Sequence, residues 1–228
     1  MHFQHSPQIR SDFPELAAGV VFARGITPDA VPDLDRFTAV AKERLAAGTE
    51  ADLPEIQAWR RAFSKMGLKP TQYRCASESL LRRFRKEGAL PRIHPLIDLC
   101  NAISLAYAIP VGVFDLAYVS RSLEVRHADG DETYVTFGGE VERPDPGEVI
   151  FADAERRAHA RRWTNRQSGH SAVRDTTDAV LIVAEAMHAT AAADVKELTT
   201  VLAHELERTW PAVREVSVES RWRTPPSA

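Results

Sequence analysis

Residues 90–116, LPRIHPLIDLCNAISLAYAIPVGVFDL, decide the fold, because they join a long apolar helix directly to a strand. Pro95 fits the first turn of a helix, where its missing N–H is not needed, and the apolar spacing continues to residue 108. Pro110 ends this helix, and VGVFDL over 111–116 is typical of a strand. Gly112 lets a ligand or a neighbouring strand approach the backbone closely. The stretch therefore predicts a buried helix that leads into a core strand.

The polar residues of this helix form one stripe. Asp98, Asn101 and Ser104 stand at positions i, i+3 and i+6, which share a helix face. Either the stripe is the narrow solvent face of a core helix, or it lines a polar pocket. The sequence leaves both interpretations open.

Helices dominate the chain before this stretch. A polar N-terminal arm is followed by a buried strand over 16–26, and three further helices have apolar residues at helical spacing. These predicted helices cover residues 32–47, 54–66 and 77–86. Pro54 at the first helical position and Ser77 as an N-cap before Glu78 are start signals.

After Pro110 the pattern changes to short β-branched runs. The expected strands are 111–116, 122–128, 132–137, 147–153 and 178–186. Asp129-Gly130 tolerates the positive φ of a tight turn and predicts a hairpin between the second and third strands, whereas 138–148 is expected to be a loop. A helix over 193–210 and an alternating strand over 213–220 follow. Helices first and strands next predict an α+β (mixed α/β) fold with a mostly antiparallel or mixed central sheet flanked by helices.

Composition is that of a globular protein without cofactor motifs. The 228 residues are 44% hydrophobic and 27% charged, and a core of this size needs no disulfide or metal. Cys75 and Cys100 lack histidines at metal-ligand spacing and are interpreted as free thiols. With no secretory signal and no apolar run of about 20 residues, a cytoplasmic protein without membrane contact is expected. The motifs GxGxxG, GxxxxGK[ST], HExxH and GxSxG are absent, so no cofactor and no metal are predicted.

The net charge of −3 hides two basic segments. Residues 55–92 contain ten basic and three acidic residues, and residues 155–166 contain five arginines and one glutamate. Together they carry +11, which leaves −14 for the rest of the chain. Arginines with interleaved aromatic residues are typical of a surface that binds a phosphate backbone and stacks on unpaired bases. Solvated helix faces give the same pattern, and the charge alone does not separate the two interpretations.

A second conspicuous stretch is residues 161–186, RRWTNRQSGHSAVRDTTDAVLIVAEA. It places a dense polar cluster directly before a buried strand. Such a cluster predicts a site at the mouth of the strand, where loops carry function, or a solvated loop anchored by its tryptophan.

These two stretches carry a family resemblance. From about Arg74 to Met187 the chain resembles the B3/B4 module of the phenylalanyl-tRNA synthetase β-subunit, here expected as a freestanding protein. The resemblance is carried by residues 90–116, by GEVIFAD over 147–153, and by the run from His170 to Val180. It implies one domain over 1–228, with a family-like core at about 74–187, a helical extension at 1–73 and a helix and strand at 188–228.

The resemblance implies a mixed α/β module with a central pocket that, in the synthetase, hydrolyses mischarged tyrosyl-tRNA. The family's Thr-Asn pair falls on Cys100-Asn101, so only the asparagine is kept. The family histidine falls on Gly112. The glutamate that accepts the tyrosine hydroxyl falls on Val183, or on Glu185 if the register slips by two, which preserves the strand face. An apolar side chain at this position would remove the recognition of tyrosine and favour a smaller or apolar aminoacyl group.

The expected function is that of an aminoacyl-tRNA deacylase acting in trans on the charged 3′ end of tRNA. Water and the oxyanion would be held by Asn101, Gln167 and the backbone at Gly112. The remaining candidates fall into two sets: Asp98, Ser104, Val183 and Glu185 for the substrate pocket, and Arg74, Arg82, Arg83, Arg162, Trp163 and Arg166 for tRNA. A non-catalytic tRNA- or amino-acid-binding module and a small-molecule-binding protein are the alternatives.

Overall fold

The computed structural model describes residues 2–213, 215–219 and 222–223. Its helices are α1 (Pro7–Asp12), α2 (Asp35–Ala46), α3 (Pro54–Lys65), α4 (Ala76–Glu87), α5 (Pro95–Tyr107) and α6 (Ala191–Thr209). Its strands are β1 (His2–His5), β2 (Ala17–Arg24), β3 (Val111–Asp115), β4 (Ser122–His127), β5 (Thr133–Val135), β6 (Val141–Glu142), β7 (Val149–Asp153), β8 (Arg157–Arg161), β9 (Arg166–Gln167), β10 (Ala179–Ala186), β11 (Glu215–Glu219) and β12 (Trp222–Arg223).

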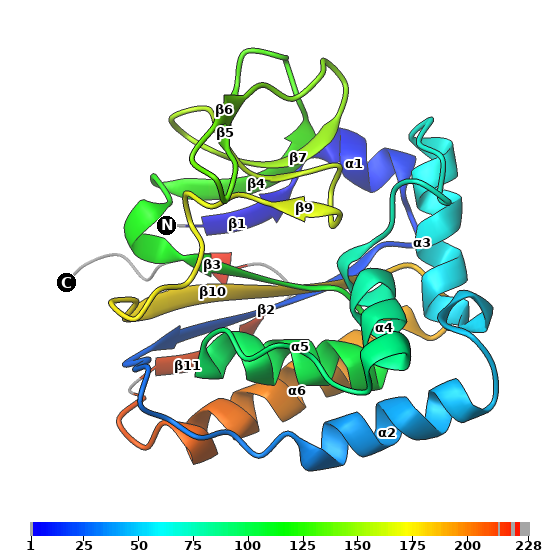
Figure 1. Ribbon diagram of the computed structural model, residues 1–228. Coiled ribbons are helices and arrows are strands. Elements are labelled where there is room, and N and C mark those ends of the chain that lie inside the picture. Colours follow the sequence, from blue (N-terminus) through cyan, green and yellow to red (C-terminus); the bar gives the residue numbers. More distant parts are fainter. Residues whose placement is uncertain (1, 214, 220–221, 224–228) are drawn as a thin grey trace.

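The strands form two sheets (Figure 1). The smaller sheet has the order β11-β2-β10-β3 and is antiparallel throughout. The larger, mixed sheet has the order β12-β1-β4-β7-β8-β5-β6, with β9 paired to β8. The smaller sheet lies between the larger sheet and helices α5 and α6, and α2 packs outside α5. The predicted α+β class is confirmed.

Strand β10 separates two hydrophobic cores because its side chains alternate between faces. Leu181 and Val183 join the core that contains Phe151 of the larger sheet. Ile182 and Ala184 join the core formed with α5 and α6. Most buried residues of α5 belong to this second core and lie on the opposite face of the sheet from Val183.

The predicted helices and most predicted strands are confirmed within a few residues at each end. Pro54 and Pro95 stand in the first turns of α3 and α5, as expected. Ser77 does not cap α4, however. Cys75 is the N-cap residue and makes no side-chain capping bond, while Ser77 is buried inside the first turn.

The hairpin predicted at Asp129-Gly130 is wrong. Gly130 does adopt a positive φ of 96°, but β4 pairs with β1 and β7, and β5 pairs with β6 and β8. Asp129-Gly130 does form a turn, but the pairing of the flanking strands is decided by sheet contacts distant in sequence.

The N-terminal arm is not a solvated tail. Phe3 of β1 and Ile9 of α1 are buried, and β1 pairs in parallel with β4. The predicted loop 138–148 also contains the short strand β6. The strand predicted over 213–220 is β11, with residues 214 and 220 outside the described residues.

Candidate functional site

A pocket opens between the two sheets, near the start of β3. Its volume is about 70 Å³. The lining residues are Ala76, Pro110, Val111, Gly112, Phe114, Phe151, Ala160, Trp163, Thr164, Asn165, Arg166, Gln167, Val183 and Glu185. Both conspicuous sequence stretches contribute to this wall, so the structure brings them together.

The β8–β9 turn directs Trp163 inward. Arg162 and Trp163 are consecutive residues in the left-handed region, with φ of 46° and 58°, a conformation that costs free energy for any residue with a Cβ. Two bonds hold it: Trp163 N–H donates to Val149 O at 2.7 Å, and Arg162 N–H donates to Glu148 Oε1 at 2.9 Å. The indole is fully buried and packs edge-on against Phe13 and Trp59.

Glu185 is the acidic residue of the pocket wall and is 1% exposed. The indole N–H of Trp163 donates to both carboxylate oxygens, at 3.0 and 3.1 Å. His5 Nε2 lies 2.6 Å from Glu185 Oε1. The carboxylate thus has protein partners on two sides while it lines the pocket.

Val183 and Glu185 lie on the same face of β10, two residues apart, and both line the pocket. Both positions at which the family resemblance could place its glutamate therefore line the pocket. Gly112 is the register partner of Val183 on β3, where a Cβ would lie 3.2 Å from the Phe114 ring.

Most polar side chains around the pocket are already bonded within the protein. Gln167 Nε2 donates to Val113 O. Asn165 Nδ2 donates to Arg74 O at 2.7 Å, and Arg166 makes two bonds to Glu142, at 2.8 and 3.0 Å. The amide oxygen of Gln167 is left as an acceptor that can hold a water molecule.

The polar stripe of α5 does not reach this pocket. Ser104 Oγ donates to Ile109 O at 2.6 Å, which ties the helix end to the following loop. Asp98 and Asn101 line a separate groove against α2 that also includes Lys42 and Arg92. The separation follows from the fold, because α5 covers the opposite face of β10. Asn101 and Asp98 therefore cannot act in the pocket that contains Val183.

The basic segments are largely neutralised by acidic partners. Arg60 and Arg74 both approach the buried carboxylate of Glu78, at 2.5 and 3.4 Å. Arg82 lies 3.6 Å from the buried Glu50, and Arg83 pairs with Glu87 one helical turn along α4. Much of the charge that resembled a phosphate-binding surface is therefore paired with carboxylates of the protein itself.

Arg162 differs from these residues. Its guanidinium lies 4.8 Å from the centre of the Tyr73 ring, in a cation–π contact, and the side chain is half-buried at the turn that carries Trp163. Arg166 lines the pocket but pairs with Glu142, so Arg162 is the candidate for a phosphate contact beside the pocket. Trp163 itself is fully buried, so its indole has no exposed face on which a base could stack.

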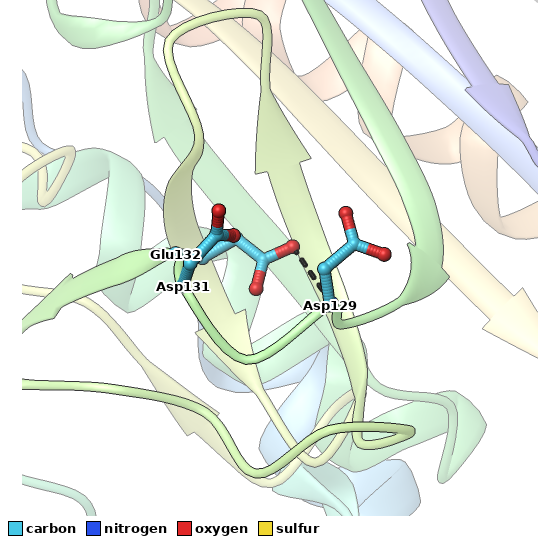
Figure 2. A group of neighbouring side chains, drawn as sticks. All are labelled: Asp129, Asp131 and Glu132. Carbon is cyan, nitrogen blue, oxygen red and sulfur yellow. Dashed lines mark hydrogen bonds between the residues drawn. The ribbon is translucent and has the colours of Figure 1, made fainter.

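A group of three carboxylates, Asp129, Asp131 and Glu132, lies in the turn after β4 (Figure 2). Glu132 accepts the N–H groups of Asp129 and Gly130, at 3.1 and 3.0 Å, and pairs with Arg126 at 2.6 Å. Arg156 binds both aspartates. Arg126 and Arg156 therefore offset the charge of the three carboxylates, and we infer no metal site here.

Asp153, His159 and Ser171 form a buried polar chain behind the pocket. His159 Nδ1 lies 2.8 Å from Ser171 Oγ, and His159 Nε2 lies 3.3 Å from Asp153 Oδ2. Burial raises the pKa of Asp153, but the adjacent His159 and the N–H groups of Arg157 and Ser120 outweigh it and lower this pKa to about 2. Neither His159 nor Ser171 lines the pocket, so the chain is structural.

Both cysteines are free and buried, as predicted. Burial raises the pKa of the Cys75 thiol to about 12 and also raises that of Cys100. Thiols of this kind are poor nucleophiles at neutral pH. Among the described residues, no helix is both long and apolar enough to cross a bilayer.

Comparison with known proteins yields one family model and a few relatives. The model of the B3/4 domain matches residues 58–212. The phenylalanine–tRNA ligase beta subunit of Shewanella oneidensis is 32% identical over 101 residues, or 44% of this chain, and that of Cereibacter sphaeroides is 30% identical over 74 residues, or 32% of this chain. The chain spans only 12% and 9% of the length of these two proteins.

A solved structure is also among the matches. It is the N-terminal fragment of the phenylalanyl-tRNA synthetase beta subunit from Pyrococcus horikoshii, with 10% sequence identity and a TM-score of 0.49. The match covers 95% of this chain and 49% of that one.

Proposed function

The chain belongs to the B3/4 domain family, and on this premise we propose that it is a tRNA-binding aminoacyl-tRNA deacylase that hydrolyses mischarged tRNA in trans. The observation that carries the proposal is the pocket between the two sheets, where an apolar wall meets a small polar set. Gln167, Glu185 and the backbone at Gly112 face the same small volume. A concave, mostly apolar site with a few convergent polar groups is typical of substrate binding.

The proposed reaction needs no cofactor and no co-reactant other than water. A water oxygen bonds to the ester carbonyl carbon, the bond from this carbon to the ribose oxygen breaks, and one proton passes to the leaving ribose hydroxyl. The products are a free amino acid and uncharged tRNA. Because the ester is already activated, a positioned water and donors for the oxyanion are sufficient catalytic groups. Gln167 Oε1 would hold the water, and backbone N–H groups near Gly112 would face the oxyanion.

The size of the pocket favours a small aminoacyl group. Its volume is about 70 Å³. One water in the liquid occupies about 30 Å³, and an engineered apolar cavity that binds benzene measures about 150 Å³. The smaller volume favours a small aminoacyl group over one with a phenol ring. Val183, one of the two positions at which the family resemblance places the tyrosine-binding glutamate, adds an apolar surface.

A deacylation screen over tRNAs charged with different amino acids tests the proposal. We expect release of small amino acids well above the spontaneous rate and little release of tyrosine. If no charged tRNA is hydrolysed faster than in buffer, the deacylase proposal is wrong.

A non-catalytic tRNA- or amino-acid-binding module is the second candidate. It is favoured by Gly112, which stands where the family resemblance places a histidine, and by Asn165 and Arg166, whose donors are bonded within the protein. This candidate predicts tRNA or amino-acid binding without ester hydrolysis in the same screen.

A further inference from the structure

Residues outside the matched family region contact the acidic residue of the pocket wall. His5 ends strand β1 and is 7% exposed, and Arg10 lies in the following helix α1. His5 Nε2 lies 2.6 Å from Glu185 Oε1, while Arg10 Nη2 lies 3.0 Å from His5 Nδ1. A chain of contacts therefore runs from Arg10 through His5 to the carboxylate in the pocket wall.

The chemistry of Arg10 fixes the proton on His5. A guanidinium only donates hydrogen bonds, so His5 Nδ1 must accept and carries no proton. The proton of the neutral imidazole is then on Nε2, which donates to Glu185 Oε1. Both ring nitrogens have a partner, so the orientation of the ring and its tautomer are set together.

The hydrogen bonds on Glu185 leave acceptor capacity on one oxygen. Oε1 accepts from His5 and from Trp163, whereas Oε2 accepts from Trp163 at 3.1 Å. A carboxylate has about four acceptor positions, so Oε2 can take a further donor. Glu185 is also the one acidic side chain among the residues that line the pocket.

We propose that His5, oriented by Arg10, is a positioning residue that holds Glu185 as the acceptor for the α-ammonium group of an aminoacyl ester. This inference rests on the proposed function and assigns a role to the N-terminal segment. An aminoacyl ester always carries an α-ammonium group, and a buried carboxylate matches its charge. The pocket then distinguishes aminoacyl esters from esters of the same shape that lack the cation. Loss of an outer-shell hydrogen-bonding partner of this kind costs about 10–100-fold where it has been measured at metal sites.

The test compares alanyl-tRNA with lactyl-tRNA, in which a neutral hydroxyl replaces the ammonium group with little change in size. Each rate is divided by the spontaneous rate of the same ester. We expect the wild-type protein to prefer the alanyl ester, His5→Phe to reduce this preference by at least about tenfold, and His5→Gln, which keeps an N–H donor, to restore most of it. His2→Phe on the exposed side of β1 is the matched control and retains the preference.

Arg10→Gln and Glu185→Gln are two further variants that test the proposal if His5→Phe does not fold. Glu185→Gln keeps the shape of the side chain but removes its charge, so it also loses the preference for the alanyl ester. The proposal is wrong if a folded His5→Phe protein discriminates between the two esters as the wild type does. If His5→Phe does not fold, the same result with Arg10→Gln would overturn it.

If the wild-type protein hydrolyses neither ester, the deacylase proposal fails while the positioning role is still decided by binding. The probes are then adenosines that carry alanine or lactate through a 3′ amide, which water does not cleave at a measurable rate. Weaker binding of the alanyl probe alone by the His5→Phe or Arg10→Gln protein supports the role of His5. An equal affinity of wild type and variant for both probes contradicts it.

Discussion

The indole N–H of Trp163 bridges both oxygens of the Glu185 carboxylate, at 3.0 and 3.1 Å, inside the pocket wall. Trp163 comes from the turn after β8 in the larger sheet, and Glu185 comes from β10 in the smaller one. The contact therefore joins the two sheets and at the same time fixes the acidic group of the pocket.

Replacing Trp163 with Phe should weaken the fold through this contact. Phenylalanine keeps much of the apolar surface but has no N–H, so Glu185 Oε2 loses its donor. A buried acceptor left without a partner costs about 1–3 kcal/mol in the free energy of unfolding. Chemical denaturation measures this change. An unfolding free energy equal to that of the wild type would show that the bond contributes nothing to stability.

The locations of Gln167 and Asn101 predict that only the substitution of Gln167 lowers the deacylation rate strongly. Gln167 lines the pocket, whereas Asn101 lies on α5 across the smaller sheet. Gln167→Ala should lower the hydrolysis rate by about 10²-fold, the size of loss that misplacing a reacting group produces. Asn101→Ala should leave the rate within about threefold of wild type, because a residue distant from the reacting atoms affects the rate little. The reverse order of effects would place the reaction in the α5 groove.

The salt dependence of tRNA binding should show whether Arg162 contacts a phosphate of the tRNA. If its guanidinium contacts a phosphate, Arg162→Gln weakens binding and reduces the slope of log K against log salt by about 1. Arg83, paired with Glu87 on α4, is the control, and Arg83→Gln should leave the slope unchanged. Equal slopes for wild type and Arg162→Gln would remove Arg162 from the tRNA contact.

The depressed pKa of Asp153 predicts a loss of stability in acid. Its carboxyl has a pKa of about 2 in the folded protein, against an ordinary value of 3.8. The unfolded chain therefore binds a proton more readily, and the stabilisation is present above about pH 4 and is lost as the pH falls towards 2. The contribution is about 2 kcal/mol, at about 1.4 kcal/mol per pKa unit.

Denaturation of wild type and Asp153→Asn between pH 5 and about pH 2.5 measures this contribution, with exposed Glu43→Gln as the control. The difference in unfolding free energy between wild type and Asp153→Asn should shrink as the pH falls. A difference that stays constant with pH would mean that the ionised form of Asp153 does not stabilise the fold.

The sequence predicts the helices well because each has a local signal. Pro95 begins α5 and Pro110 ends its apolar run, while the alternation of β10 correctly places Val183 and Glu185 on one face. Gly112, Gln167 and these two residues are candidates once the family resemblance is considered, and all four line one pocket.

What the sequence does not predict depends on contacts between distant segments. Asp98, Asn101 and Ser104 share a helix face, but helical spacing does not say which side of a sheet the helix will cover. His5 stands in a four-residue strand, too short for its alternation to be read, and its partner Glu185 is 180 residues away. In the sequence, Arg60 and Arg82 resemble part of a phosphate-binding surface. In the fold they form ion pairs with Glu78 and Glu50.

The relative hydrolysis rates of alanyl-tRNA and tyrosyl-tRNA test the central claim most directly, each divided by its rate in buffer. A pocket of about 70 Å³ lined by Val183 predicts clear acceleration for the alanyl ester and little for the tyrosyl ester. Hydrolysis of tyrosyl-tRNA as fast as that of alanyl-tRNA would contradict the account.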